Sequence, residues 1–207
     1  PIVLADLPVE IDEERLWPRL HALAGSDETA RIRDILQWAR EHAHPGGVYR
    51  FCSVERVDGE SVVVDGVPLT GPLVRRKLPA AKRVFPFIAT CGQVLDKRGE
   101  GAGDLLERFW WSEVCSAVMR GALRALRRDL AQRFGVSEQI PFLSPGSGDV
   151  RLWPVSEQAR VFELLGEAPA RIGVSLRSAA TAVMMPGHSM AGLFYPGRND
   201  FSTCRLC

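Results

Sequence analysis

The chain has 207 residues, of which 46% are hydrophobic and 25% are charged, and its 26 basic and 25 acidic side chains leave a formal net charge of +1. This length suits one large domain or two small ones with a sizeable buried core. The balanced charge argues against a nucleic-acid binder or a polybasic membrane anchor, because both need a concentrated excess of one sign. No apolar run approaches the ~20 residues that span a bilayer. The first residues lack the basic flank and apolar core of a secretory signal, so we expect a cytoplasmic protein.

Two helices are predicted between residues 11 and 43, the second of them capped by Asp27. Apolar residues recur at helical spacing in each: Ile11, Leu16, Leu20 and Leu23 in the first, and Ile32, Ile35, Leu36 and Ala39 in the second. Gly46 and Gly47 are expected to break the second helix. We therefore expect an N-terminal helical segment, 1–47, that covers the remainder, 48–207, as part of one compact unit.

The apolar period changes to two after Val48, which predicts a β-meander. Its predicted elements are strands at 48–54 and 61–64, Asp-Gly turns at 58–59 and 65–66, and a following basic helix around 75–77. A buried strand is predicted from Arg83 to Thr90, ending at Cys91-Gly92 before a helix N-terminus. That junction is either a tight strand-to-helix connection or a site for an anion or a ligand carboxylate.

The longest predicted helix begins after a flexible link at Gly99–Gly103, is capped by Asp104 and runs to about Phe134, a length of ~45 Å. Its apolar face is nearly continuous: Leu105, Leu106, Phe109, Trp110, Val114, Ala117, Val118, Gly121, Ala122, Ala125, Leu126 and Leu130. A helix this apolar must be covered along most of its length, and strands before and after it can supply the cover. We therefore predict an α+β fold in which a curved antiparallel sheet packs on a long central helix.

A turn-dense loop follows at 144–149, reading Ser-Pro-Gly-Ser-Gly-Asp, in which two glycines are free to take positive φ. Such a loop can present backbone N–H and C=O groups to a small polar ligand. Ser156 is predicted to cap a short helix beyond it. The two apolar runs between Val183 and Tyr195, around Pro186-Gly187, predict a hairpin laid against the core.

Five short motifs occur in order along this half of the chain: Ser-Pro-Gly-x-Gly-Asp, Trp-Pro-x-x-Glu-Gln, Phe-x-Leu-Leu, Ile-Gly-Val-x-Leu and Met-Pro-Gly-x-Ser-x-x-Gly-Leu-Phe-Tyr. Together they resemble the activation domain of vitamin B12-dependent methionine synthase, and most closely the stand-alone relatives of that domain. The resemblance implies an activation-domain fold. It also implies a role in corrinoid (cobalamin) reactivation, in which a partner methionine synthase is remethylated from S-adenosylmethionine during reduction.

The resemblance also assigns candidate site residues. The loop residues implied to contact S-adenosylmethionine, mainly through the backbone, are Ser144, Pro145, Gly146, Ser147 and Gly148. His188 lies in the segment that the resemblance places near the corrinoid, where its imidazole could hydrogen-bond the corrin or could be a half-exposed surface group. The implied partners are a corrinoid-binding methionine synthase or related methyltransferase and a reductase, with neither nucleic acid nor a membrane.

Five cysteines do not suggest a disulfide framework. Cys52 and Cys115 suit small buried side chains. Cys204 and Cys207 form Cys-x-x-Cys at the end of the chain, a spacing that can hold one face of a zinc site or an iron–sulfur cluster if other ligands complete it. They are the candidate metal ligands, with an incidental pair as the alternative.

Some positions depart from the family pattern. A basic residue, Arg120 or Arg124, stands where the family carries an acidic one on the long helix, Phe142 replaces an arginine, and Ser147 replaces a tyrosine. Two alternatives therefore stay open. Beside the reactivation role, the chain could be a corrinoid-capping or iron–sulfur electron-transfer module that no longer binds S-adenosylmethionine, or an unrelated enzyme on the same scaffold that takes an anionic substrate.

Overall fold

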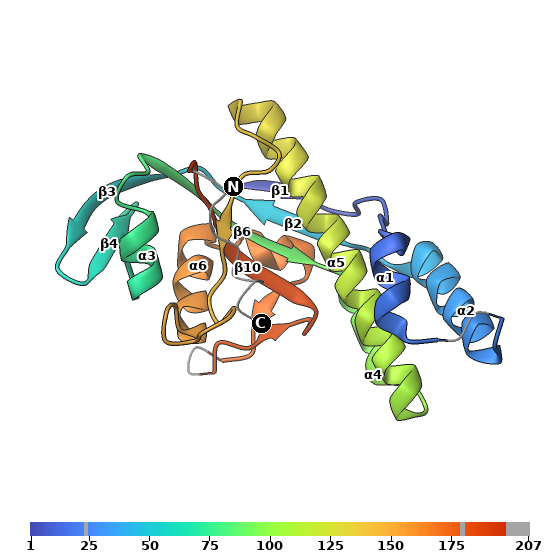
Figure 1. The fold of residues 1–207 in the computed structure, drawn as a ribbon. Helices are drawn as coiled ribbons and strands as arrows, with labels where there is room; N and C mark the ends of the chain where they lie inside the picture. The colour runs from blue at the N-terminus through green and yellow to red at the C-terminus, as the bar shows by residue number, and fades with distance from the viewer. Residues whose placement is uncertain (23–24, 179–180, 198–207) are drawn as a thin grey trace.

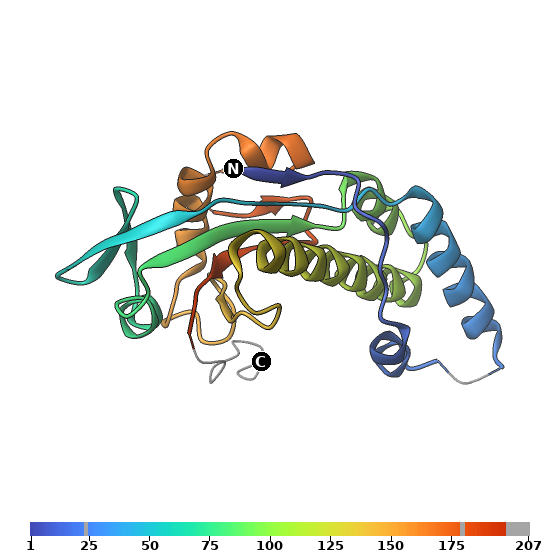
Figure 2. The ribbon, with the colours of Figure 1, turned by 90° about the horizontal axis from the view of Figure 1, so that it is seen from above.

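The structure is a computed structural model that describes residues 1–22, 25–178 and 181–197. An antiparallel sheet lies between helix α5 on one face and helix α6 on the other (Figures 1 and 2). The helices are α1 Glu13–Leu20, α2 Asp27–His42, α3 Pro72–Lys77, α4 Gln93–Glu100, α5 Leu105–Phe134 and α6 Gln158–Leu165, with 3-10 turns η1 Val155–Glu157 and η2 Ala168–Ile172. The strands are β1 Ile2–Leu4, β2 Gly46–Tyr49, β3 Cys52–Asp58, β4 Ser61–Val64, β5 Val67–Thr70, β6 Arg83–Thr90, β7 Phe142–Leu143, β8 Ser175–Leu176, β9 Met184–Met185 and β10 Ser189–Phe194. The predicted α+β fold, with its antiparallel sheet and long helix, is confirmed.

Strand β6 is the centre of the main sheet. It pairs with β2 and β3 along one edge and with β10 along the other, always antiparallel. β10 in turn pairs with β7, which leads directly into the 144–149 loop. Most residues of β6 are buried because both faces of the sheet are covered.

Side chains of the central strands alternate between two hydrophobic clusters. Phe85, Phe87 and Ala89 of β6 join the cluster under α5, while Val84 and Ile88 join the cluster under α6. Strand β10 alternates in the same way, so that a register shift of one residue would exchange the two clusters. This two-sided burial fixes the position of β10 relative to α5, which matters for the site.

Helix α5 has the bounds that the sequence predicts. The Asp104 carboxylate accepts a hydrogen bond from the Glu107 N–H (N···O 2.7 Å), and Gly135 ends the helix at φ +63°. Helices α1 and α2 pack against α5 rather than against the sheet (Figure 1). The Trp110 indole of α5 donates to the Leu20 carbonyl oxygen of α1 over 3.2 Å, which ties the two helices together.

Three predicted details near the N-terminus need correction. The cap of α2 is Ser26, whose hydroxyl accepts from the Thr29 N–H, and not Asp27. Gly46 and Gly47 do not break a helix, since α2 already ends at His42 and the two glycines begin β2. A Cβ on Gly47 would lie 2.7 Å from the Leu126 side chain of α5. Glycine is needed there for the close approach of helix and sheet. The predicted boundary at 47/48 falls inside β2, and the division into two parts stays a prediction.

The strand predicted at 48–54 is two strands, interrupted at Arg50 and Phe51, that follow the same edge of β6. The predicted link at Gly99–Gly103 is partly helical, since Gly99 belongs to α4. The Asp65-Gly66 turn occurs where predicted, whereas the first turn lies at Gly59 and Glu60, one residue later than predicted, because Asp58 still pairs with Ser61 at the end of β3. Among the described residues, no helix combines the length and apolar composition that a membrane crossing requires.

The prediction of a hairpin between Val183 and Tyr195 is wrong. β9 pairs with β8 in a separate small sheet, whereas β10 pairs with β6 and β7. The chain changes sheets because the N–H groups of Gly187 and His188 donate to the Asp96 carboxylate of α4 rather than to a neighbouring strand. A side chain distant in sequence therefore determines the path of this segment.

Candidate functional site

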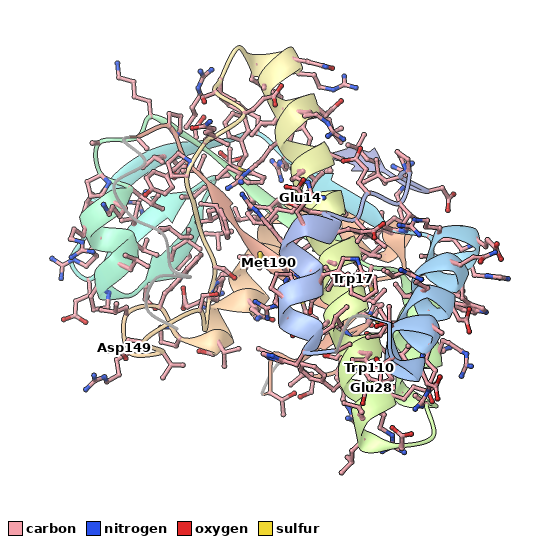
Figure 3. All side chains as sticks on the ribbon, turned by 45° about the vertical axis from the view of Figure 1, so that its right-hand side comes forward. Glu14, Trp17, Glu28, Trp110, Asp149 and Met190 are labelled. Atoms are coloured by element: carbon pink, nitrogen blue, oxygen red, sulfur yellow. The ribbon has the colours of Figure 1, made fainter. Side chains whose placement is uncertain are left out.

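The 144–149 loop is anchored to the sheet through its first residue. The buried Ser144 hydroxyl donates to the Ala191 carbonyl oxygen of β10 over 2.8 Å. Gly146 and Gly148 have φ values of +77° and +73°, the left-handed conformation that the sequence predicts. In Figure 3, the labelled Asp149 lies on this loop, away from α1 and α2.

Two backbone donors of the loop are used within the protein. The Gly146 N–H donates to the Trp153 carbonyl oxygen over 2.8 Å, and the Ser147 N–H donates to the Ser144 carbonyl oxygen over 3.2 Å. A Cβ on Gly146 would lie 3.1 Å from the Val155 side chain, so this glycine also allows the loop to pack closely. In this arrangement a ligand would meet the carbonyl groups and the Ser147 hydroxyl more readily than these two N–H groups.

The segment after the loop differs from the prediction. Ser156 is not a helix cap, since the chain forms a 3-10 turn after Pro154 and α6 begins without a side-chain cap. The neighbouring Glu157 carboxylate instead accepts from the Thr70 N–H and hydroxyl over 2.9 and 2.8 Å. These bonds tie the turn to β5.

Phe142 and the arginines of α5 are engaged in packing and pairing. The Phe142 ring packs edge-on against Phe87 and Phe194, and the Arg127 guanidinium lies 5.1 Å from its centroid. Arg124 donates to the Glu10 carbonyl oxygen over 3.0 Å. This face of α5 is therefore cationic and partly closed by the protein's own side chains.

His188 belongs to a hydrogen-bonded triad with Asp96 of α4 and Ser112 of α5. The His188 Nδ1 lies 2.6 Å from Asp96 Oδ1, and its Nε2 lies 3.0 Å from the Ser112 hydroxyl oxygen. The same carboxylate accepts from the N–H groups of Gly187 and His188 over 2.8 and 3.0 Å. Asp96 is only 4% exposed, whereas the His188 side chain is 30% exposed.

The charges of this pair are mutually stabilised. Burial would raise the pKa of the Asp96 carboxyl, but the hydrogen bonds from the His188 ring and from the two N–H groups outweigh it and lower the pKa. The hydrogen bond to Asp96 raises the pKa of His188 against the opposing effect of burial, with further support from the negative charge of Glu100. An ionised Asp96 can only accept, so Nδ1 carries its proton.

The sequence predicted His188 as a site residue but gave no partner for it. Asp96 and Ser112 were missed because they are separated from His188 by 92 and 76 residues. The one sequence signal for Ser112 was that a serine interrupts the otherwise apolar face of the long helix. Ser144 holds β10 at Ala191, three residues beyond His188, so at a strand rise of ~3.3 Å per residue the loop and the triad lie about 10 Å apart along one strand.

The cysteines within the described residues are buried. Cys52, Cys91 and Cys115 are free thiols, and burial raises the pKa of Cys52 to about 12. Cys204 and Cys207 lie outside the described residues. Within the described part of the chain, no group of three or more His, Cys, Asp or Glu side chains is placed to hold a metal ion.

Comparison of the sequence with protein-family models and with curated proteins gives no match. Among solved structures, the fold is similar to one described as the crystal structure of the MetH reactivation domain bound to AdoHcy. The likeness covers 98% of this chain and 81% of that one, with a TM-score of 0.63 and 17% sequence identity. At this identity the likeness establishes the fold, which is that of the MetH reactivation domain.

Proposed function

We propose that this chain is a reactivation-type domain that docks on a corrinoid-dependent methyltransferase, such as a vitamin B12-dependent methionine synthase. The observation that carries the proposal is the likeness to the MetH reactivation domain over nearly the whole chain. The five motifs of the C-terminal half support it independently, because they occur in family order.

The ligand of the proposed function is S-adenosylmethionine or its product S-adenosylhomocysteine, bound beside the 144–148 loop. The two left-handed glycines bring the main chain to the surface there, and the anchoring bond from Ser144 to Ala191 holds the loop against β10. S-adenosylmethionine supplies the methyl group and the partner's cobalamin receives it. The contribution of this chain is to position the donor and to exclude water, since positioning alone accounts for much of such a rate.

A second candidate function is favoured by the internal bonds of the loop. The Gly146 and Ser147 N–H groups donate to Trp153 and Ser144, which leaves fewer backbone donors for an adenosyl ligand. In this alternative the chain caps the corrinoid, or passes electrons to it through an iron–sulfur cluster, without binding S-adenosylmethionine. Cys204 and Cys207 would supply part of such a cluster or of a zinc site.

Calorimetric titration of the full chain with S-adenosylhomocysteine tests the ligand. We expect saturable binding that Gly148→Val weakens by at least tenfold, because a branched side chain at φ +73° strains the loop. Gly66→Val is the matched control, since Gly66 has φ +81° in the β4–β5 turn and a Cβ there meets open space. Absence of heat at millimolar ligand with a folded wild type would exclude the adenosyl ligand and leave the second candidate.

The partner is tested separately with purified, cobalamin-loaded methionine synthase that lacks its own reactivation domain. We expect the full chain to co-elute with it in gel filtration. Failure to associate in either cobalt oxidation state would refute docking and with it both candidates. An absorption spectrum and metal analysis of anaerobically purified chain, compared with a Cys204→Ser/Cys207→Ser variant, then distinguish a bound cluster or zinc from an incidental cysteine pair.

A further inference from the structure

The Asp96–His188–Ser112 triad has the connectivity of a nucleophile, a base and an orienting carboxylate. Its distances, 2.6 Å from Asp96 Oδ1 to His188 Nδ1 and 3.0 Å from His188 Nε2 to Ser112 Oγ, are within the range for activated serines. Three separate segments supply the members: α4, the turn before β10, and α5. Such an arrangement is recognised by geometry and not by the order of residues in the sequence.

The orienting end of the triad is rigid and the reacting end is accessible. Asp96 is 96% buried, and its carboxylate is held by two backbone N–H groups as well as by the imidazole. His188 and Ser112 are both partly exposed. The carboxylate therefore fixes the ring with Nδ1 protonated, and the Nε2 faces the serine hydroxyl.

We propose that Ser112 is an acyl-accepting nucleophile, with His188 as its general base and Asp96 as the positioning residue, and that its substrates are apolar esters. Ser112 Oγ would bond to the carbonyl carbon of the ester while its proton passes to His188 Nε2. The alkoxide leaving group would then depart with that proton as an alcohol, leaving an O-acylated Ser112. Water, deprotonated by His188, would release the acid and regenerate the hydroxyl.

The apolar class of substrate follows from the surface next to Ser112. Leu105 and Phe109 precede it by seven and three residues on α5, so all three lie on one stripe of the helix. Leu105 is 84% exposed and Phe109 is 39% exposed, so both side chains present apolar surface to solvent on this stripe. At 1.5 Å per residue, the stripe extends about 10 Å from Ser112 and offers an apolar platform for an acyl chain.

The charges around His188 set the expected pH dependence. From α4 it faces Asp96 and Glu100, and from α5 the Cys115 side chain. Glu113 lies beside Ser112 and is paired with Arg19 of α1 over 2.5 Å, so its charge is compensated. Because His188 must be neutral to accept the serine proton and its pKa lies above the ordinary 6.5, acylation should increase as the pH rises through that raised pKa.

The helical position of Ser112 determines which assay suits the proposal. Backbone N–H groups inside α5 donate to carbonyls within the helix, so they do not form a pair of oxyanion donors at the hydroxyl. We therefore expect covalent capture of activated reagents and slow ester turnover, and not the rates of an efficient hydrolase.

The test treats the full chain with a fluorophosphonate, which forms an Oγ–P bond and releases fluoride, and locates the adduct by peptide mass spectrometry. We expect one adduct, on Ser112, that forms faster at pH 8.5 than at pH 6. Ser112→Ala should abolish it, and His188→Gln should slow it by about 100-fold or more, the contribution of a general base. Ser116→Ala, one turn along the same face, is the matched control and should label as the wild type does.

Two further readouts bear on Asp96 and on the acyl platform. Asp96→Asn should lower the pH at which labelling increases, because His188 loses its anionic partner. Phe109→Gln should slow the release of p-nitrophenol from the octanoate ester more than from the acetate. The proposal is overturned if folded wild type stays unlabelled at pH 8.5, if the adduct lies elsewhere, or if His188→Gln labels Ser112 at the wild-type rate.

Discussion

Replacing Asp96 by alanine should destabilise the fold more than any substitution of an exposed carboxylate in this chain. The variant leaves the Gly187 N–H, the His188 N–H and the His188 ring without the acceptor that now lies 2.6–3.0 Å away. Removing one partner of a buried ion pair costs roughly 3–5 kcal/mol. With a urea dependence of about 2 kcal/mol per molar, the midpoint of unfolding should fall by about 2 M.

Equilibrium urea unfolding followed by tryptophan fluorescence measures this loss. Asp149→Ala is the matched control, because Asp149 also accepts from a backbone N–H and pairs with Arg151, but on the surface. Its midpoint should stay close to that of the wild type. Equal shifts for the two variants would refute the reasoning, since burial of Asp96 would then have no energetic consequence.

The same pair gives the stability a defined pH dependence. The raised pKa of His188 means that its ionic contribution is complete below the ordinary value of 6.5 and is lost as the pH rises through the folded value. The lowered pKa of Asp96 means that its contribution is present above 3.8 and is lost as the pH falls through its folded value. The difference between wild type and Asp96→Ala should therefore be larger at pH 5.5 than at pH 8.5.

Three other substitutions test close packing and a buried hydrogen bond. Gly121→Ala places a Cβ 2.3 Å from the Glu10 carbonyl oxygen, so it should cost about 1–3 kcal/mol and lower the melting temperature by about 3–9 °C in a calorimetric scan. Gly192→Ala places a Cβ 2.3 Å from the Leu143 carbonyl oxygen and should cost a similar amount, with loss of hydrogen-exchange protection in β7; unchanged protection there would contradict the close contact. Tyr49→Phe removes a phenol whose pKa is raised by burial and by its bond to a carboxylate of α5, and should cost about 1 kcal/mol. Ultraviolet titration of the wild type should show this phenol still protonated above pH 10.

The features that the sequence predicts well are those with local causes. Helix α5 has a cap, a continuous apolar face and a terminal glycine, all within 104–135, and its predicted bounds agree with the structure. Strand β6 was predicted because a short, continuous apolar run is typical of a strand buried on both faces, and β6 is such a strand. The two hairpin turns depend on the residues at the turn itself, and they were predicted to the residue at 65–66 and within one residue at 59–60.

The features that it predicts poorly have distant causes. Gly46 and Gly47 have the composition of a helix break, yet Gly47 is required by Leu126, a side chain 79 residues away. The apparent hairpin at 183–195 satisfies every local rule, but Asp96 holds its central turn and directs the two strands into different sheets. No local pattern contains that information, because the acceptor lies on another helix.

The candidate site divides in the same way. The positive φ values of Gly146 and Gly148 follow from residue type and were predictable, whereas the partners of the loop N–H groups were not. His188 was selected from its surroundings in sequence, but its chemistry is set by Asp96 and Ser112. The residue type alone indicates which roles are chemically possible, and the neighbouring groups in the fold determine which of them the residue can perform.

Strand β10 links the two regions for which we propose functions. Ser144 binds its Ala191 carbonyl, and His188 immediately precedes its first residue, Ser189. Because packed strands move as units, a change that displaces β10 should affect both the loop and the triad. The two proposals nevertheless stay separable. Adenosyl ligand binding depends on the backbone of the loop, whereas labelling depends on the Ser112 hydroxyl, which lies on α5 and is hydrogen-bonded to His188. A Ser112→Ala variant that binds S-adenosylhomocysteine normally and resists the fluorophosphonate would therefore assign the two chemistries to different elements of one fold.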